Sequence, residues 1–126
     1  MNHHFWSRIT LAFVFFYHGL VPKILFLSPV EVSMIDAHGI NLPAEVVATV
    51  GGGMEIGLAL LILWFRYSRW PLIIALAALV MLLLDVMIFS PGLLIEAFNP
   101  LTTNITAIVL CLIGLSGDPH QSRQKQ

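Results

Sequence analysis

The chain has 126 residues, of which 58% are hydrophobic and only 10% are charged. Soluble domains carry about 25% charged residues, so a small soluble globule is disfavoured, and disorder is disfavoured because it requires low hydrophobicity. The net charge of −1 provides no basic surface for nucleic acid, which is not expected as a partner. The composition therefore predicts a small integral membrane protein whose main partner is the lipid bilayer.

Four segments are apolar and close to the roughly 20 residues that a helix needs to cross a bilayer. They cover residues 5–27, 44–65, 71–90 and 100–116. The predicted fold is all-α, a bundle of four transmembrane helices that forms a single domain over residues 1–126. The fourth span, capped by Asn99 and Pro100, is the shortest. Either the apolar residues 93–98 lengthen it or it crosses with little tilt.

The first span begins near a positive residue, Arg8, as a cleaved signal peptide would. No small-residue cleavage site follows it, and His18 and Lys23 interrupt the apolar run. We therefore expect this segment to be retained as a span.

The connection between the first two spans is predicted to hold a short amphipathic helix on the outer surface. Residues 28–31 match a capping box, with Pro29 at the first helical position. Gly39 has the character of a C-terminal stop. The apolar face of this helix is expected to carry Val32, Met34, Ile35 and His38.

Positive residues are distributed unequally between the two sides of the predicted bundle. Lys23 lies toward one side, and the other side holds Arg8, Arg66, Arg69, Arg123 and Lys125. Because positive loops stay in the cytoplasm, both termini are predicted to be cytoplasmic. An aromatic belt at the same interface supports this orientation, formed by Trp6, Trp64, Tyr67 and Trp70.

Each predicted span carries polar side chains in its outer half, whereas the inner halves are almost purely apolar. The candidate residues for ligand binding or proton relay are His18, Lys23, Glu55, Asp85 and Asn104. Charged side chains in hydrocarbon are costly and usually face the interior of a bundle. We therefore expect these side chains to converge on a polar cluster or cavity that opens toward the outside.

Functional and structural interpretations of these residues both stay open at this point. Lys23 paired with Asp85 or Glu55 is either a charged gate for a ligand or a structural ion pair, with Lys23 snorkelling to the interface. Glu55, near the middle of the bilayer, is a candidate proton acceptor or hydrogen-bond partner. His18 either contacts a ligand or makes an interhelical hydrogen bond, and Pro22 one turn later frees a carbonyl group near it.

A glycine-rich segment in the second span predicts close helix packing. Gly53 and Gly57 form a small-xxx-small face, and Gly52 with Ala48 extends a neighbouring ridge. Packing inside the bundle is the expected role of this face. A homodimer contact, or a narrow space for a flat ligand, is the alternative.

No catalytic residue and no metal site are predicted from the spacing of the titratable residues. The histidines other than His18 lie in the termini or the outer connection, so haem binding within one chain is not expected, and no metal-ligand spacing occurs. Cys111, the single cysteine, forms no intrachain disulfide and is expected to be a small buried hydrophobe.

Several motifs occur in a fixed order along the chain and carry a resemblance to a known family. They are Tyr17-His18-Gly19-Leu20-Val21-Pro22-Lys23, then Ser28-Pro29 with Glu31 and Met34, then Gly52-Gly53 with Glu55 and Gly57, and finally Asn99-Pro100-Leu101-Thr102. In this order they resemble the DoxX-like family of small four-helix membrane proteins, over nearly the whole chain from Arg8 to Gly114. The resemblance implies a four-helix bundle in the bacterial inner membrane.

The resemblance also implies a functional setting, as an associational argument. The family takes its name from a subunit linked to thiosulfate oxidation with quinone reduction, and relatives are associated with membrane redox complexes. The expected role is a non-catalytic accessory subunit of a quinone-linked redox system, with a quinone as candidate ligand and a redox subunit as candidate partner. A structural interaction protein, as a homo-oligomer or with other subunits, and a small-molecule transporter are the alternatives.

Within this expectation each candidate residue has a distinct task. His18 and Glu55 hydrogen-bond the ligand or exchange protons with it. Lys23 and Asp85 set the local charge, and Asn104 positions one edge of the ligand.

Overall fold

The computed structural model describes residues 2–116, and this part of the chain is helical apart from turns and short connections. In chain order the elements are α1 (His3–Leu20), the π-helical turn η1 (Val21–Leu25), α2 (Pro29–Asp36), α3 (Ala44–Trp64), α4 (Trp70–Phe89), the 3-10 turn η2 (Pro91–Ile95) and α5 (Pro100–Leu115). No strand occurs in the described residues. The all-α prediction is confirmed.

Three helices are long and apolar enough to cross a membrane: α1 with its continuation to Leu25, α3 and α4. Helix α5 has 16 residues, and at 1.5 Å per residue it covers roughly 24 Å, less than the ~30 Å hydrocarbon core of a bilayer. The apolar residues 93–98 do not lengthen it, because η2 ends at Ile95 and the Asn99 side chain caps a new helix by accepting from the Thr102 N–H. A membrane protein is thus supported, and a fourth complete span stays a prediction.

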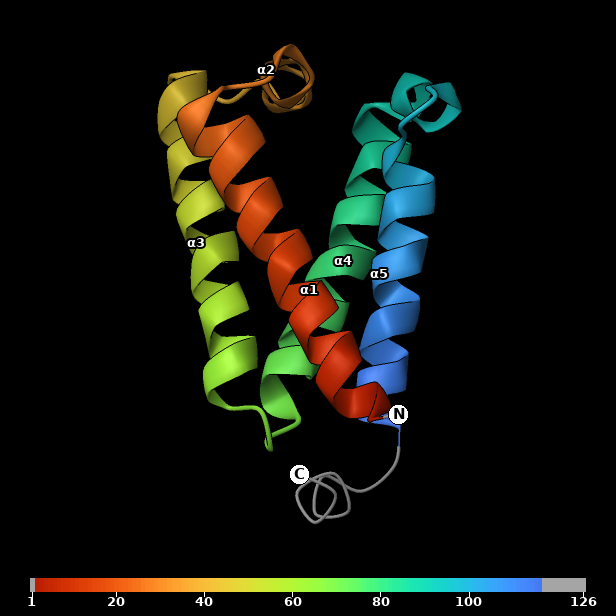
Figure 1. Ribbon diagram of the computed structural model, residues 1–126. Coiled ribbons are helices and arrows are strands. Elements are labelled where there is room, and N and C mark those ends of the chain that lie inside the picture. The colour runs from red at the N-terminus through yellow and green to blue at the C-terminus, as the bar shows by residue number, and fades with distance from the viewer. Residues whose placement is uncertain (1, 117–126) are drawn as a thin grey trace.

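The helices form two pairs that diverge toward one end of the molecule (Figure 1). α1 lies along α3, α4 lies along α5, and α1 crosses α5 where the pairs meet. We call the end that holds the start of α1 and the turn after α3 the closed end. We call the other end, where α2 and η2 lie, the open end. The backbones of the two pairs are therefore farther apart at the open end than at the closed end.

The closed half of the bundle is filled by apolar side chains. Its core includes the fully buried residues Leu11, Ile62, Leu72, Ala75 and Cys111. Cys111 is therefore a buried small hydrophobe, as predicted. These core side chains provide no polar lining for a continuous path through this half of the described chain.

The close approach of α1 and α3 depends on Gly19 and Gly52, two positions that face each other. A Cβ atom on Gly19 would lie 2.5 Å from the Gly52 carbonyl oxygen, and one on Gly52 would clash with the Gly19 carbonyl oxygen. Gly53 and Gly57 have open space where a Cβ would be. α3 is rotated so that Gly52, rather than Gly53 or Gly57, faces α1, and a packing role for Gly53 and Gly57 stays a prediction. A homodimer contact at Gly53 and Gly57 stays a prediction.

The predicted outer helix is present as α2 and differs from expectation at its first turn. The Ser28 hydroxyl caps the helix by accepting from the Val30 N–H, and Gly39 follows the helix with a φ of 66°. The reciprocal half of a capping box is not made, because the Glu31 carboxylate pairs with Lys23 instead.

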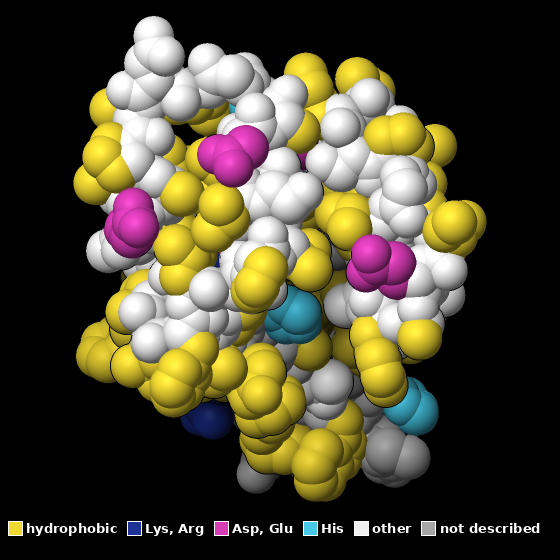
Figure 2. All heavy atoms as spheres, turned by 90° about the horizontal axis from the view of Figure 1, so that it is seen from above, with side chains coloured by type: hydrophobic (Ala, Val, Ile, Leu, Met, Phe, Trp, Pro, Cys, Tyr) yellow, Lys and Arg dark blue, Asp and Glu magenta, His cyan; other side chains and the backbone are white. Residues whose placement is uncertain are grey.

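The arginines and the carboxylates of the described residues lie toward opposite ends of the bundle. Arg8, Arg66 and Arg69 lie at the closed end, and Arg123 and Lys125 fall outside the described residues. Acidic side chains lie toward the open end, where Figure 2 shows them on both halves of the surface seen from above. The arginines from which cytoplasmic termini were predicted thus lie together at one end. The orientation in the membrane stays a prediction.

Candidate functional site

A cavity of about 400 Å³ lies between the two helix pairs at the open end. Its walls are mainly apolar, and residues from α1, α2, α3, α4 and α5 contribute to it. The polar residues that line it are His18, Lys23, Glu31, His38, Glu55, Asp85, Glu96, Asn99, Thr103 and Asn104. All five residues predicted from the sequence are among them, so the structure brings them together around one space. Their binding role stays a prediction.

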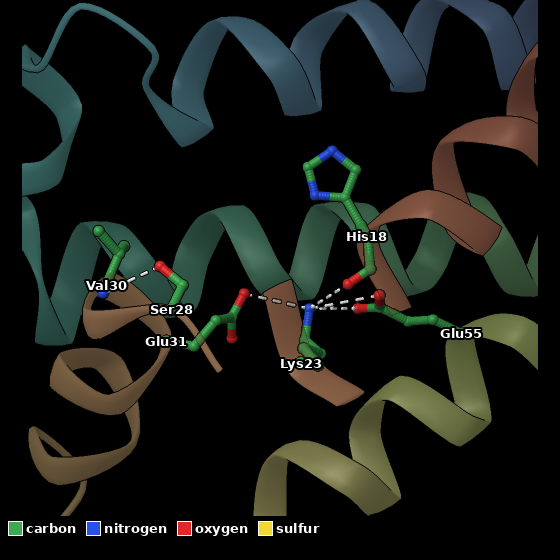
Figure 3. A network of polar contacts seen from close by, with 6 residues as sticks. All are labelled: His18, Lys23, Ser28, Val30, Glu31 and Glu55. Carbon is green, nitrogen blue, oxygen red and sulfur yellow. Dashed lines mark hydrogen bonds and ion pairs between the residues drawn. The ribbon is translucent and has the colours of Figure 1, made fainter. Parts of the chain in front are cut away.

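Lys23 lies between two carboxylates and pairs with both (Figure 3). Its Nζ atom is 3.1 Å from Oε1 of Glu55 and 3.2 Å from Oε1 of Glu31, and all three side chains are at most 17% exposed. Of the two partners considered for Lys23, the structure selects Glu55 rather than Asp85. This cluster joins η1, α2 and α3 at the wall of the cavity.

Pro22 explains why Lys23 takes this position. Proline has no N–H, so the carbonyl oxygen of His18, four residues earlier, loses its usual helical donor. The Lys23 ammonium group donates to that oxygen at 3.4 Å. The backbone continues as a π turn, in which the Phe26 N–H donates to the Val21 carbonyl oxygen.

Asp85 accepts a hydrogen bond from His38 across the mouth of the cavity. The Nε2 atom of His38 is 2.6 Å from Oδ1 of Asp85, its Nδ1 atom is 2.7 Å from the Met34 carbonyl oxygen, and its ring stacks on Phe89 at 4.3 Å. A carboxylate and a carbonyl oxygen both accept, so both ring nitrogens donate only in the imidazolium form. The hydrogen bond to Asp85, followed by that to Met34, raises the pKa of His38.

His38 and Glu31 were not identified as site residues from the sequence. Each was explained by a local role, His38 as part of an amphipathic face and Glu31 as part of a helix cap. The spacing of four between Met34 and His38 places both on one face, and this spacing was the one sequence feature that could have pointed to His38. The span that this face contacts depends on tertiary packing.

The His18 ring points away from the Lys23 cluster and toward α5 (Figure 3). It contacts the Tyr17 ring edge-on, with centroids 6.3 Å apart. Within residues 2–116 the ring makes no hydrogen bond, so the interhelical hydrogen bond considered for it is not formed. The ring is thus a polar group of the cavity with donor and acceptor capacity available.

Asn104 contributes a second polar group of this kind from α5. Its side-chain amide lines the cavity and makes no hydrogen bond within the described part of the chain. The neighbouring hydroxyl of Thr103 is satisfied by its own helix, since it donates to the Asn99 carbonyl oxygen at 3.1 Å. Asn104 therefore offers two N–H donors and one acceptor to the space between the pairs.

Metal chemistry has no evident basis in the geometry of this site. Among residues 2–116, no three His, Cys, Asp or Glu side chains are close enough to hold a metal ion together. The site instead combines apolar walls, two internally paired charge clusters, and the unbonded His18 and Asn104 side chains.

The fold and the cavity define an all-helical membrane protein with a polar-lined space at one end. Residues 12–112 match the DoxX-like family, and the chain belongs to this family. The resemblance carried by the motifs is therefore confirmed. No curated protein and no solved structure matches the chain.

Proposed function

We propose that the protein is an accessory, non-catalytic subunit of a quinone-linked membrane system and that it holds a neutral, quinone-type ligand in the cavity at the open end. Four spans cross the bacterial inner membrane, with both termini in the cytoplasm and the cavity facing the periplasm. The arginines at the closed end and the acidic residues at the open end support this orientation, because positive segments stay inside.

The state of the charged groups supports a neutral ligand. Lys23 is already paired with Glu55 and Glu31, and His38 is paired with Asp85. An anionic ligand has to displace one of these carboxylates from Lys23 or His38 at a cost, since a charge left unpaired in a partly buried site is destabilising. The roles expected for Lys23 and Asp85, which set the local charge, are retained. Glu55 acts with them rather than as a direct ligand contact.

The single observation that carries the proposal is that His18 and Asn104 face one cavity with hydrogen-bonding capacity unused in the described chain. They come from α1 and α5, two helices in contact. A neutral ligand with carbonyl or hydroxyl oxygens satisfies such groups directly. An apolar ligand without oxygen leaves them unbonded at a cost of about 1–3 kcal/mol each if they are desolvated.

A quinone head group fits these residues in size and chemistry. Ligand cavities usually measure about 300–1,000 Å³, and this one is about 400 Å³ with mainly apolar walls. His18 and Asn104 would hold the ring oxygens, and the apolar walls of the cavity would contact the tail. A bound quinone supplies the capacity to accept two electrons and two protons. His18 is the chain's group for holding or passing a proton at a ring nitrogen.

The alternatives are weaker on specific observations. A transporter needs a continuous path, whereas Leu11, Ile62 and Leu72 are fully buried in the closed half of the bundle. A purely structural subunit has no use for hydrogen-bonding groups left open in a cavity. Gly53 and Gly57, where an added Cβ would meet open space, are compatible with a homodimer contact, which does not compete with ligand binding at the open end.

Mass spectrometry of small molecules that co-purify with the protein in mild detergent tests the proposal. We expect a quinone in the wild type and a loss of most of it in the His18→Phe and Asn104→Leu variants. Tyr17→Phe and Thr106→Val are matched controls, because they alter neighbouring polar residues of the same helices outside the cavity lining. Recovery of lipid alone from the wild type, or equal quinone in all variants, contradicts the proposal.

A further inference from the structure

A second, smaller hollow lies at the closed end, far from the cavity. Its volume is about 120 Å³, and it lies between the first turns of α1 and the end of α3 with its following turn. The polar side chains that line it are those of His4, Arg8, Arg66 and Tyr67, and its apolar lining includes Phe5 and Ile9. The proposed quinone site uses none of these residues.

Arg8 is fixed by the end of α3. It is only 6% exposed, and its guanidinium group donates to the carbonyl oxygens of Ile62 at 3.1 Å, Phe65 at 3.2 Å and Ser68. These three bonds occupy three of the five N–H donors of a guanidinium group. Two donors remain on a cation whose orientation is set by the fold.

Arg66 supplies a second, less constrained guanidinium group to the same hollow. Its Cζ atom lies 4.9 Å above the centre of the Tyr67 ring, so a cation–π contact holds it in place. Within residues 2–116, Arg66 makes neither a hydrogen bond nor an ion pair. Its planar set of donors, suited to two oxygens of a phosphate group, is open.

No carboxylate of residues 2–116 competes for these cations. The described segments of the closed end, residues 2–16, 58–80 and 106–116, contain no Asp or Glu. The charged side chains that these segments contribute are therefore all positive, and an anion is the complementary ligand.

The apolar neighbours indicate which kind of anion matches the hollow. Phe5 is 37%, Ile9 39% and Leu63 46% exposed, so the hollow continues into an apolar surface. Trp6 and Trp64, 55% and 82% exposed, belong to the aromatic residues typical of a membrane–water interface. A free phosphate ion matches only the arginines, whereas an anionic phospholipid matches both parts.

We propose that this hollow binds the phosphate group of an anionic phospholipid, with Arg8 and Arg66 donating to the phosphate oxygens and an acyl chain lying along Phe5, Ile9 and Leu63. Basic pockets of this kind between membrane helices recognise anionic head groups. The inference is independent of the quinone proposal, because the two sites share no residue.

Thermal unfolding of the protein in mild detergent, titrated with phosphatidylglycerol or with phosphatidylcholine of the same acyl chains, tests this site. We expect phosphatidylglycerol to raise Tm in a saturable manner and phosphatidylcholine to have little effect. Arg66→Gln is expected to weaken the apparent affinity about tenfold, as for the loss of a charge-assisted hydrogen bond. Inorganic phosphate tests for a free-phosphate site.

Arg69→Gln is the matched control, since it removes the same charge at the same end. Arg69 donates to the Leu115 carbonyl oxygen at 2.8 Å and does not line the hollow, so the lipid response of this variant should equal that of the wild type. The proposal would be overturned if the two lipids raised Tm equally or if Arg66→Gln and Arg69→Gln lost lipid affinity equally. It would also be overturned if inorganic phosphate alone raised Tm as much as phosphatidylglycerol does.

Discussion

The Nε2 atom of His38 lies 2.6 Å from Oδ1 of Asp85, and this contact joins the turn after α2 to α4 across the mouth of the cavity. The Met34 carbonyl oxygen fixes the other ring nitrogen, and Phe89 fixes the plane of the ring. Because α2 otherwise packs on α3, the contact connects the two helix pairs at the end where they diverge. Its state therefore affects access to the cavity.

Raising the pH is expected to loosen α2. The pKa of His38 is raised from its ordinary value by the hydrogen bonds to Asp85 and Met34. A group with a raised pKa contributes its full stabilisation below the ordinary value, about 6.5, and loses it as the pH rises through the raised pKa. We predict that hydrogen-exchange protection factors of the α2 amides, corrected for intrinsic exchange rates, fall over that range.

The His38→Gln variant isolates this effect, because glutamine does not titrate. Its α2 protection should be low and independent of pH between pH 5 and 8, while α5 protection stays as in the wild type. A wild-type α2 whose protection does not change over this range would show that the contact carries no pH dependence.

Removing the charge of Lys23 is expected to destabilise the bundle. Lys23→Met leaves Glu31 and Glu55 close together without their cation, and breaking a buried pair on one side costs about 3–5 kcal/mol. We predict a lower Tm in detergent. Adding Glu55→Gln to Lys23→Met should restore part of the loss, since it removes one of the two carboxylates.

The matched control is Glu45→Gln, which removes one exposed carboxylate from the first turn of α3, the helix that holds Glu55. Its Tm should stay close to that of the wild type. If the double variant is less stable than Lys23→Met, the carboxylates are not the source of the loss.

Alanine at position 52 is expected to separate α1 from α3. The added Cβ meets the Gly19 carbonyl oxygen, a backbone atom that cannot rotate away, and overpacking of this kind costs about 1–3 kcal/mol. Gly53→Ala, one residue later with open space at its Cβ, should be neutral or slightly stabilising. Chemical unfolding in mixed detergent measures the stability of both variants. Equal stabilities would show that α1 and α3 do not make their close approach at Gly52.

Much of the fold follows from local properties of the sequence. Apolar runs set the long helices, while Ser28 and Asn99 cap α2 and α5 through contacts with the next few residues. Gly39 lies in the turn that follows α2 and takes the left-handed backbone region there. Each of these signals is contained within a few positions, so sequence periodicity and capping chemistry were enough to find them.

Contacts between elements were harder to predict because they depend on helix rotation. The π turn at Val21–Leu25 departs from the 3.6-residue period, so the face that carries Lys23 does not follow from helical spacing. The rotation of α3 likewise decides that Gly52, rather than Gly53, faces α1. The positions of the polar residues along the predicted spans indicated which of them share the cavity. The pairs Lys23–Glu31 and His38–Asp85 depend on how the helices pack, so the sequence did not predict them.

Affinity for a short-chain ubiquinone, measured in lipid nanodiscs with a double-mutant cycle on His18 and Asn104, tests most directly whether the cavity holds a neutral quinone-type ligand. We predict that His18→Phe and Asn104→Leu each weaken binding about tenfold, as for one lost hydrogen bond, with a larger loss in the double variant. Tyr17→Phe and Thr106→Val should bind as the wild type does. Equal affinity in all variants, or no saturable binding to the wild type, would contradict this assignment.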